Sequence, residues 1–95
     1  MTFQDTIELM QSGDYEDRFK AEYWQTRIRY ERLKSFNNRI EAAEATSFRE
    51  NAVDMPEHDC PAEMLRNQQR VMGEYLHILE VRAVIEDVDL YSKGE

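Results

Sequence analysis

A run of roughly 30 residues without glycine or proline constrains this chain most strongly. It extends from Tyr15 to about Ala45, and because glycine and proline are the residues that interrupt helices, it predicts one helix about 45 Å long. Apolar and aromatic side chains recur within it at alternating spacings of four and three residues, which is typical of a heptad seam. The members of this seam are Phe19, Tyr23, Thr26, Tyr30, Leu33 and Ile40, with Asn37 interrupting the series.

The seam predicts a second long helix that packs against the first. Such a helix is expected from about residue 61 to 87, because Pro61 suits a first helical turn and a matching apolar stripe follows it. That stripe consists of Leu65, Met72, Leu76, Leu79 and Ala83. A short helix is expected at about residues 3–11, ended by the "SGD" turn, with a loop at 46–60 and a tail at 88–95. We therefore predict a single all-α domain over residues 1–95, built as an antiparallel two-helix hairpin with a short N-terminal helix.

Each long helix also carries apolar residues on the side away from the seam. At 100° per residue these are Trp24 and Ile28 on the first helix, and Val71, Ile78, Val81 and Ile85 on the second. A hairpin covers only one side of each helix, and the short N-terminal helix can cover one of the two remaining patches. An apolar strip of this length is a liability in a monomer. The sequence therefore predicts a homo-oligomeric helical bundle.

Charge is unevenly distributed along the chain. The formal net charge is −8, from 12 basic and 20 acidic side chains, which argues against nucleic acid as a partner because a basic face supplies most of that affinity. Arg27 to Arg39 nevertheless holds five cations and one acid, whereas Glu41 to Glu63 holds seven acids and one cation. A basic patch on an acidic body favours a small anionic ligand or an acidic face of another subunit.

Further sequence features bear on the cellular location, on metal binding and on catalysis. The acidic start "MTFQDTIELM" is unlike a secretory signal, and no apolar run approaches a membrane span, so we expect a cytoplasmic protein without a membrane partner. His58 and Cys60 lie among loop carboxylates, but no second ligand cluster accompanies them, so no metal site is predicted. No phosphate-binding glycine loop or nucleophile motif is present. We expect no catalytic residues, no cofactor and no enzymatic activity.

The stretch "AEYWQTRIRYERLKSF" supplies the candidate binding site. Its cations alternate with aromatic side chains along one side of the helix, so that rings could stack on bases while arginine and lysine meet phosphates. The candidate ligand-binding residues are Tyr23, Trp24, Arg27, Tyr30, Lys34 and, from the second helix, Arg70. Taken singly, the same residues also suit core tyrosines, an interface tryptophan and a solvated charged edge.

The segments "DYEDRFKAEYWQTRIRYERLKSF" and "CPAEMLRNQQRVMGEYLHILEVRAVIE" resemble those of a family of small phage and prophage helical-hairpin proteins, over residues 14 to 88. The layout is also similar to that of phage anti-defence sponges, which sequester the nucleotide signals of CBASS or Thoeris immunity between subunits of an oligomer. The resemblance implies a non-enzymatic protein in the host cytoplasm that binds an immune nucleotide, with cyclic nucleotides among the candidates. The alternatives are an acidic module that inhibits or adapts a host protein, and a structural or DNA-associated accessory role.

Overall fold

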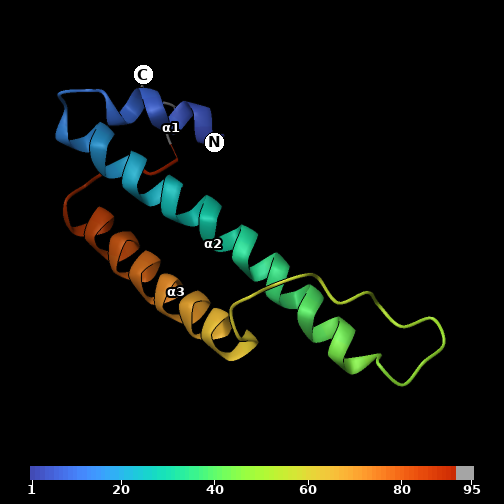
Figure 1. The fold of residues 1–95 in the computed structure, drawn as a ribbon. Coiled ribbons are helices and arrows are strands. Elements are labelled where there is room, and N and C mark those ends of the chain that lie inside the picture. Colours follow the sequence, from blue (N-terminus) through green and yellow to red (C-terminus); the bar gives the residue numbers. More distant parts are fainter. Residues whose placement is uncertain (92–95) are drawn as a thin grey trace.

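The computed structural model describes residues 1–91 and consists of three helices with no strand among those residues. They are α1 (Phe3–Met10), α2 (Tyr15–Ala45) and α3 (Ala62–Ile85). Figure 1 shows α2 and α3 running side by side in opposite directions, with α1 folded back over the N-terminal part of α2. The predicted all-α hairpin with a short N-terminal helix is therefore the arrangement observed. Of the predicted tail at 88–95, residues 92–95 lie outside the described residues.

Local signals explain where the first two helices begin. Thr2 and Asp5 form a capping box, in which the Asp5 amide donates to the Thr2 hydroxyl and the Thr2 amide donates to the Asp5 carboxylate. Asp14 follows the glycine turn and accepts a hydrogen bond from the Glu16 amide at 3.1 Å. Both caps satisfy amides that a helix start leaves without an intrahelical partner.

The third helix ends at Ile85, two residues before the expected end. Asp87 adopts a left-handed conformation with φ of 56°, and the Val88 amide donates to the Ala83 carbonyl at 2.8 Å. This is the Schellman arrangement, which terminates a helix and reverses the chain. The reversal returns Val88 and Leu90 to the hairpin, where both side chains are buried.

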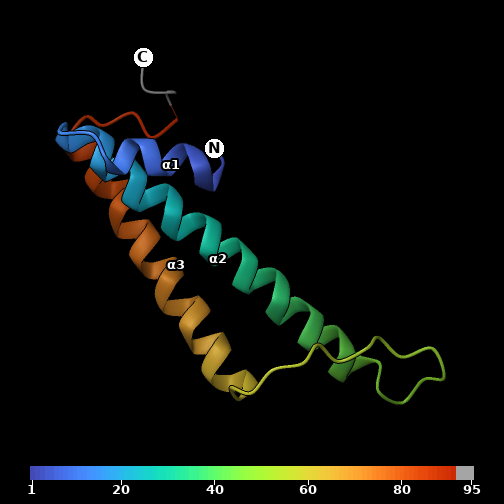
Figure 2. The same ribbon diagram turned by 45° about the horizontal axis from the view of Figure 1, so that its top comes forward.

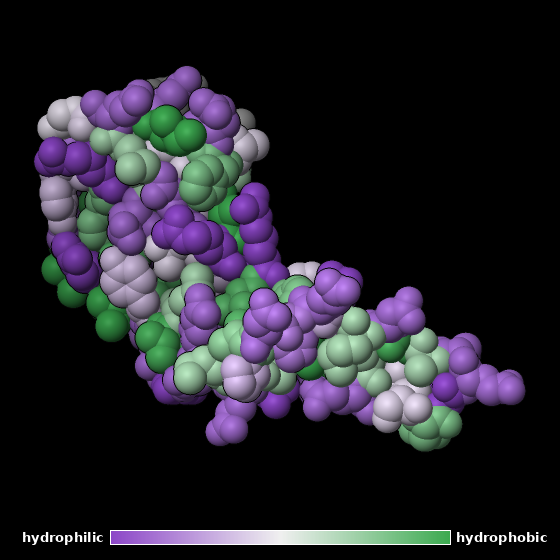
Figure 3. Space-filling model, viewed as in Figure 1, coloured by the Kyte–Doolittle hydropathy of each residue, from purple (hydrophilic) through white to green (hydrophobic). Residues whose placement is uncertain are grey.

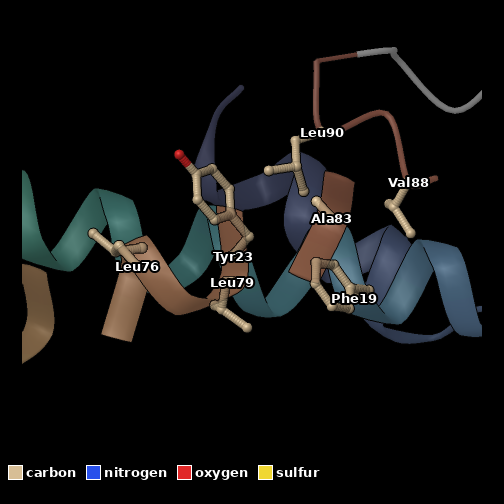
Figure 4. Close-up of a cluster of buried hydrophobic side chains, with 7 residues drawn as sticks. All are labelled: Phe19, Tyr23, Leu76, Leu79, Ala83, Val88 and Leu90. Atoms are coloured by element: carbon tan, nitrogen blue, oxygen red, sulfur yellow. The ribbon is translucent and has the colours of Figure 1, made fainter. Parts of the chain in front are cut away.

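The core lies at the end of the hairpin that carries α1. Figure 4 shows its side chains converging from α2, from α3 and from the segment after α3. The members are Phe19, Tyr23, Leu76, Leu79, Ala83, Val88 and Leu90. Each fully buried large apolar side chain contributes about 1.5–3 kcal/mol relative to exposure, so this cluster is the main source of stability that the hairpin has.

The short helix α1 covers a second side of α2. Thr6 on α1 is fully buried, and its hydroxyl accepts a hydrogen bond from the Gln25 side-chain amide of α2 at 3.1 Å. The helix α1 therefore covers one of the sides of α2 that do not face α3.

At the opposite end the two long helices diverge, as Figure 2 shows. The helix α3 has 24 residues against 31 in α2, and the segment 46–61 doubles back along the end of α2 before α3 begins. The rings of Phe36 and His58 meet edge to face there, with centroids 6.2 Å apart. The start of α3 therefore lies beside Asn37, whose side chain donates to the Leu65 carbonyl.

The outward side of α3 is apolar and exposed. Val71, Ile78, Val81 and Ile85 are between 44% and 76% exposed, and apolar residues follow the outer edge of α3 in Figure 3. The predicted patch on the second helix is therefore present on the surface of the single chain.

Candidate functional site

The six predicted ligand-binding residues occupy two separate places. Tyr23, Trp24 and Arg27 meet one another and the segment that follows α3, near the core. Tyr30 and Arg70 line a groove between α2 and α3, further along the hairpin. Lys34 is exposed on α2, four residues after Tyr30 and four before Asn38 of the same groove. Helical spacing places Lys34 on the side of α2 that carries this groove.

The first place is an internal network. The Tyr23 hydroxyl donates to a Glu80 carboxylate oxygen at 2.7 Å and accepts from the Arg27 guanidinium at 3.2 Å. The guanidinium also lies 4.9 Å from the centre of the Trp24 ring. Trp24 donates from Nε1 to the Leu90 carbonyl at 2.7 Å, and the Tyr91 ring meets it edge to face. These contacts tie α2, α3 and the C-terminal segment together.

Burial of Tyr23 has an electrostatic consequence. The side chain is fully buried, and this desolvation, followed by the hydrogen bond to the Glu80 carboxylate, raises the pKa of the Tyr23 phenol far above its ordinary value of 10.0. The phenol stays protonated at neutral pH. Tyr23 therefore acts as a hydrogen-bonding core residue in the described chain.

The second place, which we call the α2–α3 groove, is an open depression of about 450 Å³ where the two helices begin to diverge. Its volume falls in the range of small-molecule sites. The lining residues come from both helices and are almost all polar: Tyr30, Asn37, Asn38 and Glu41 from α2, and Arg66, Gln69, Arg70 and Gly73 from α3.

Asn37 forms the most unusual feature of the α2–α3 groove. Its side chain is only 5% exposed, and its Nδ2 donates both to the Leu65 carbonyl at 3.1 Å and to Gln69 Oε1 at 2.9 Å. Its Oδ1 is buried and has no hydrogen-bond partner among the described residues. A buried acceptor left unsatisfied costs about 1–3 kcal/mol. Asn37 therefore carries an unsatisfied acceptor that is buried beneath the lining of the groove.

Tyr30 reaches the α2–α3 groove because Gly73 lets it approach α3. A Cβ atom placed on Gly73 would lie 3.3 Å from Tyr30 Cε1 and 3.5 Å from its hydroxyl oxygen. Glycine in a helix interior costs about 1 kcal/mol relative to alanine. The glycine at position 73 allows the Tyr30 ring to lie close to α3. The ring is half-buried there, beside the polar lining of the groove.

Two arginines of α3 stand at the edge of the α2–α3 groove. The Arg70 guanidinium donates to Glu74 Oε1 at 2.9 Å and to Asn67 Oδ1 at 2.7 Å. Arg66 Nη1 lies 3.5 Å from Glu44 Oε1, so this ion pair joins α3 to α2. Their side chains are at least half exposed, and ion pairs of this kind contribute about 0–1 kcal/mol. Both guanidinium groups are therefore easily redirected toward an anionic ligand.

The same two arginines also border a second depression on the outer side of α3, of about 630 Å³. All of its lining residues belong to the start of α3 or immediately precede it: Pro61, Glu63, Met64, Arg66, Asn67 and Arg70. Because one short stretch of the chain supplies this lining, the depression has a single wall and is open opposite that wall.

Sequence reasoning did not select Asn37, Arg66, Gln69 or Gly73. Two of them left a signal in the sequence, since Asn37 interrupts an otherwise apolar seam and Gly73 interrupts an otherwise good helix. A polar residue at a core position and a glycine in a helix both call for a tertiary reason. Arg66 and Gln69 left none, because exposed arginine and glutamine are common on helices.

Residues 1–91 contain neither a cluster of metal ligands nor a membrane-spanning helix. No group of three or more histidine, cysteine, aspartate or glutamate side chains in that range is placed to hold a metal ion. None of the helices there has the length and apolar character needed to cross a bilayer.

Comparison with known proteins adds one positive finding. No curated protein and no solved structure matches the chain. The Sequestin family model, by contrast, matches residues 13–85, from the turn before α2 to the last residue of α3. The match covers most of the chain and includes both walls of the α2–α3 groove. The chain therefore belongs to the Sequestin family.

Proposed function

We propose that this protein binds a nucleotide immune signal of the CBASS or Thoeris type and sequesters it without converting it, as a phage anti-defence protein. The family name denotes sequestration and so supports a role in holding a partner. The resemblance of the hairpin to anti-defence sponges supports the nucleotide and the phage setting.

The α2–α3 groove is the observation that carries this proposal. It combines the three features that nucleotide recognition needs: the Tyr30 ring for stacking, arginines at its edge for phosphate, and the exposed amide of Asn38 for a base edge. These features come from residues on both long helices, which hold them in place without a loop. A preformed site of this kind favours tight binding because less ordering is needed.

The chemistry of the α2–α3 groove favours binding over catalysis. Its described lining residues offer amides, a phenol, arginines and one carboxylate, Glu41. A nucleophile activated by a neighbouring base, the usual requirement for covalent catalysis, is not among them. Holding the ligand is the action that this set supports.

We further propose that the protein acts as a homo-oligomer in which the outer side of α3 packs against a second copy. Met64, Val71, Ile78 and Ile85 are all exposed and follow one another at intervals of seven residues. This stripe is about 32 Å long at 1.5 Å per residue and reads the same in antiparallel orientation, as a two-fold interface requires. A second copy placed there would also close the open side of the depression beside Arg66 and Arg70.

Substitution within the stripe tests the oligomer. Sedimentation equilibrium of the wild-type chain should give a multiple of 11.4 kDa, and Ile78→Glu should give 11.4 kDa, because a buried charge at the centre of the stripe opposes pairing. His77→Glu is the matched control, since it adds the same charge at a neighbouring exposed position off the stripe. A wild-type chain that sediments as a monomer at all concentrations would contradict this assembly.

Calorimetric titration tests the function. The full chain is titrated with cyclic dinucleotides, cyclic trinucleotides and cyclic ADP-ribose isomers at physiological salt. We expect one of these classes to bind stoichiometrically and to be recovered chemically unchanged when the protein is denatured by heat. Absence of binding across the panel, or conversion of the bound nucleotide, would contradict the proposal.

Charge removal at the α2–α3 groove locates the site. Arg70→Ala should weaken nucleotide binding about tenfold or more, since a charge-assisted contact to phosphate contributes about 1.5–3 kcal/mol. Arg18→Ala, which removes an exposed arginine at the other end of α2, is the control and should leave the affinity unchanged. Equal effects of both variants would indicate general electrostatic attraction without a site.

A second candidate function rests on the acidic segment between the long helices. Glu50, Asp54 and Glu57 are exposed there, beside Phe48, which is 84% exposed, and Met55. Exposed apolar side chains among acids are typical of a protein-binding surface. We expect a host protein to be retained by the wild-type chain and lost when the three acids are neutralised; retention by the neutralised chain would contradict this function.

A further inference from the structure

Val84 is an apolar side chain near the end of α3 that neither the hairpin nor the apolar stripe of α3 explains. It is 82% exposed, more than any of the four stripe residues, and it adjoins Val81 and Ile85, which are exposed as well. It lies two heptads after Arg70, so the two side chains share nearly the same side of α3. Exposed apolar side chains gathered in this way are typical of a surface that another chain covers.

The two-fold pairing proposed for α3 determines what Val84 would face. Antiparallel pairing of the stripe sets Met64 of one copy against Ile85 of the second, so the end of one α3 lies beside the start of the other. A two-fold axis perpendicular to the helices sets each side of α3 against the same side of its copy. Val84 of the second copy therefore lies opposite the stretch that carries Arg66 and Arg70.

Arg66 and Arg70 separate two depressions of the surface. They line the α2–α3 groove on one side and the outer depression of α3 on the other. Both side chains are at least half exposed, and solvent screens the attraction of such a guanidinium for phosphate. An apolar wall over the outer depression would exclude water and strengthen that attraction. The single chain supplies the arginines, whereas the opposite side of the depression is open.

We propose that Val84 of a second copy forms the missing wall of the phosphate site, so that Arg66 and Arg70 are enclosed only in the assembled protein. This inference rests on the proposed nucleotide function and on the proposed pairing of α3, and it adds a residue of the second copy to the site. The two-fold axis creates two such sites in each pair of chains. Because the ligand then binds the pair better than the separate chains, ligand and assembly stabilise each other.

Cross-linking between two different variants tests the placement of Val84. In a Cys60→Ala background, one chain carries Asn67→Cys, in the outer depression, and the other carries Val84→Cys. We expect a short bis-maleimide to join the two chains in an equimolar mixture. Each variant alone should stay unjoined, because identical positions lie more than about 20 Å apart in the antiparallel pair. An unjoined mixture, or a cross-link within either variant alone, would overturn the inference.

Anion binding tests the contribution of Val84 to the site. Inorganic pyrophosphate is the probe, because it offers one phosphate to each arginine and has no base. We expect calorimetry to show at least about tenfold weaker binding in Val84→Glu than in the wild-type chain, because the new carboxylate competes with the probe for Arg70 of the other copy. Gln11→Glu adds the same charge at an exposed position on the far side of the hairpin and should leave the affinity unchanged.

Mixed assemblies distinguish a residue of the second copy from a residue of the same chain. Arg70→Ala removes the arginine and Val84→Glu obstructs it, so neither variant alone should bind pyrophosphate as the wild-type chain does. A pair formed from one chain of each variant has one site in which Arg70 and Val84 are both intact. An equimolar mixture should therefore recover about one quarter of the wild-type binding capacity. If both residues acted within one chain, the mixture would recover none.

The outcomes separate this inference from the function on which it rests. A mixture that recovers no binding, or unchanged pyrophosphate affinity in Val84→Glu, would overturn the inference and leave nucleotide binding in place. Absence of pyrophosphate binding by the wild-type chain would overturn it as well. If the cross-link and pyrophosphate binding are found but no cyclic nucleotide binds, the proposed function alone is overturned.

Discussion

The two ends of the hairpin are held together by different physical means. At the end that carries α1, Phe19, Tyr23 and Leu79 interlock in a core that a reversed C-terminal segment closes. At the other end, Asn37 and Gln69 join the helices through an amide pair, and the helices diverge. Apolar burial is concentrated at the first end and polar contact at the second. One heptad seam forms both kinds of contact because a single polar residue, Asn37, interrupts it.

The largest contrast between the two ends should come from core truncation. Leu79→Ala removes a side chain that is 2% exposed and should lower the free energy of unfolding by about 2–5 kcal/mol. Leu65→Ala, at the diverging end, removes a half-buried side chain and should cost less than half as much. Urea denaturation of both variants measures the difference, and equal losses would mean that the two ends are equally packed.

Alkaline pH should weaken the core end selectively. The pKa of Tyr23 is raised in the folded chain by burial and by the hydrogen bond to Glu80. The stability that this raised pKa contributes is therefore fully present below the ordinary phenol pKa of 10.0 and is lost progressively as the pH rises above it. Absorbance of phenolate should show one of the five tyrosines ionising only with unfolding. If all five ionise while the helical circular dichroism is unchanged, Tyr23 is not buried as described.

Replacing Asn37 by leucine should make the diverging end resemble the core end. The substitution removes an unsatisfied buried acceptor and extends the apolar seam, but it also removes the donor to the Leu65 carbonyl and to Gln69 Oε1. Because these effects oppose each other, we expect stability to change by no more than about 1 kcal/mol. Nucleotide binding should be lost at the same time. Thermal unfolding and calorimetry on the same sample measure both effects, and a strongly destabilised variant would show that the Asn37–Gln69 pair is a structural requirement.

The smallest expected effect on stability is that of Gly73→Ala. Alanine gains about 1 kcal/mol in helix propensity, but its Cβ would lie 3.3 Å from Tyr30 Cε1, so the ring must give way slightly and the two effects should nearly cancel. Affinity for nucleotide should fall because the added methyl group occupies space beside the Tyr30 ring in the groove. Gln68→Ala, on an exposed part of α3, is the control for helix propensity alone. Unchanged affinity in Gly73→Ala would show that the ligand does not occupy the space beside Gly73 and the Tyr30 ring.

Several elements of the fold could be predicted from sequence because their causes are local. The uninterrupted run from Tyr15 to Ala45, the cap at Asp14 and the heptad spacing each act within a few residues. The end of α3 was placed two residues too far, because Asp87 adopts a conformation that glycine usually occupies and so gave no stop signal. The candidate site residues lie in two separate places because contacts between distant residues, and not local patterns, decide their surroundings. Tyr30 and Arg70 do line one groove, while Tyr23, Trp24 and Arg27 are tied to Glu80, Leu90 and Tyr91.

By itself, the sequence determined the helices, their apolar seams and the cationic aromatic composition of α2, since propensity, capping and periodicity depend on neighbours along the chain. Tertiary structure alone decided which of those cations and rings remain available to a ligand. The contacts that decide this join residues 28 to 66 positions apart, such as Asn37 with Leu65 and Trp24 with Leu90. Their pairing depends on the relative register and divergence of two helices, which the packing of the core sets and no local pattern encodes.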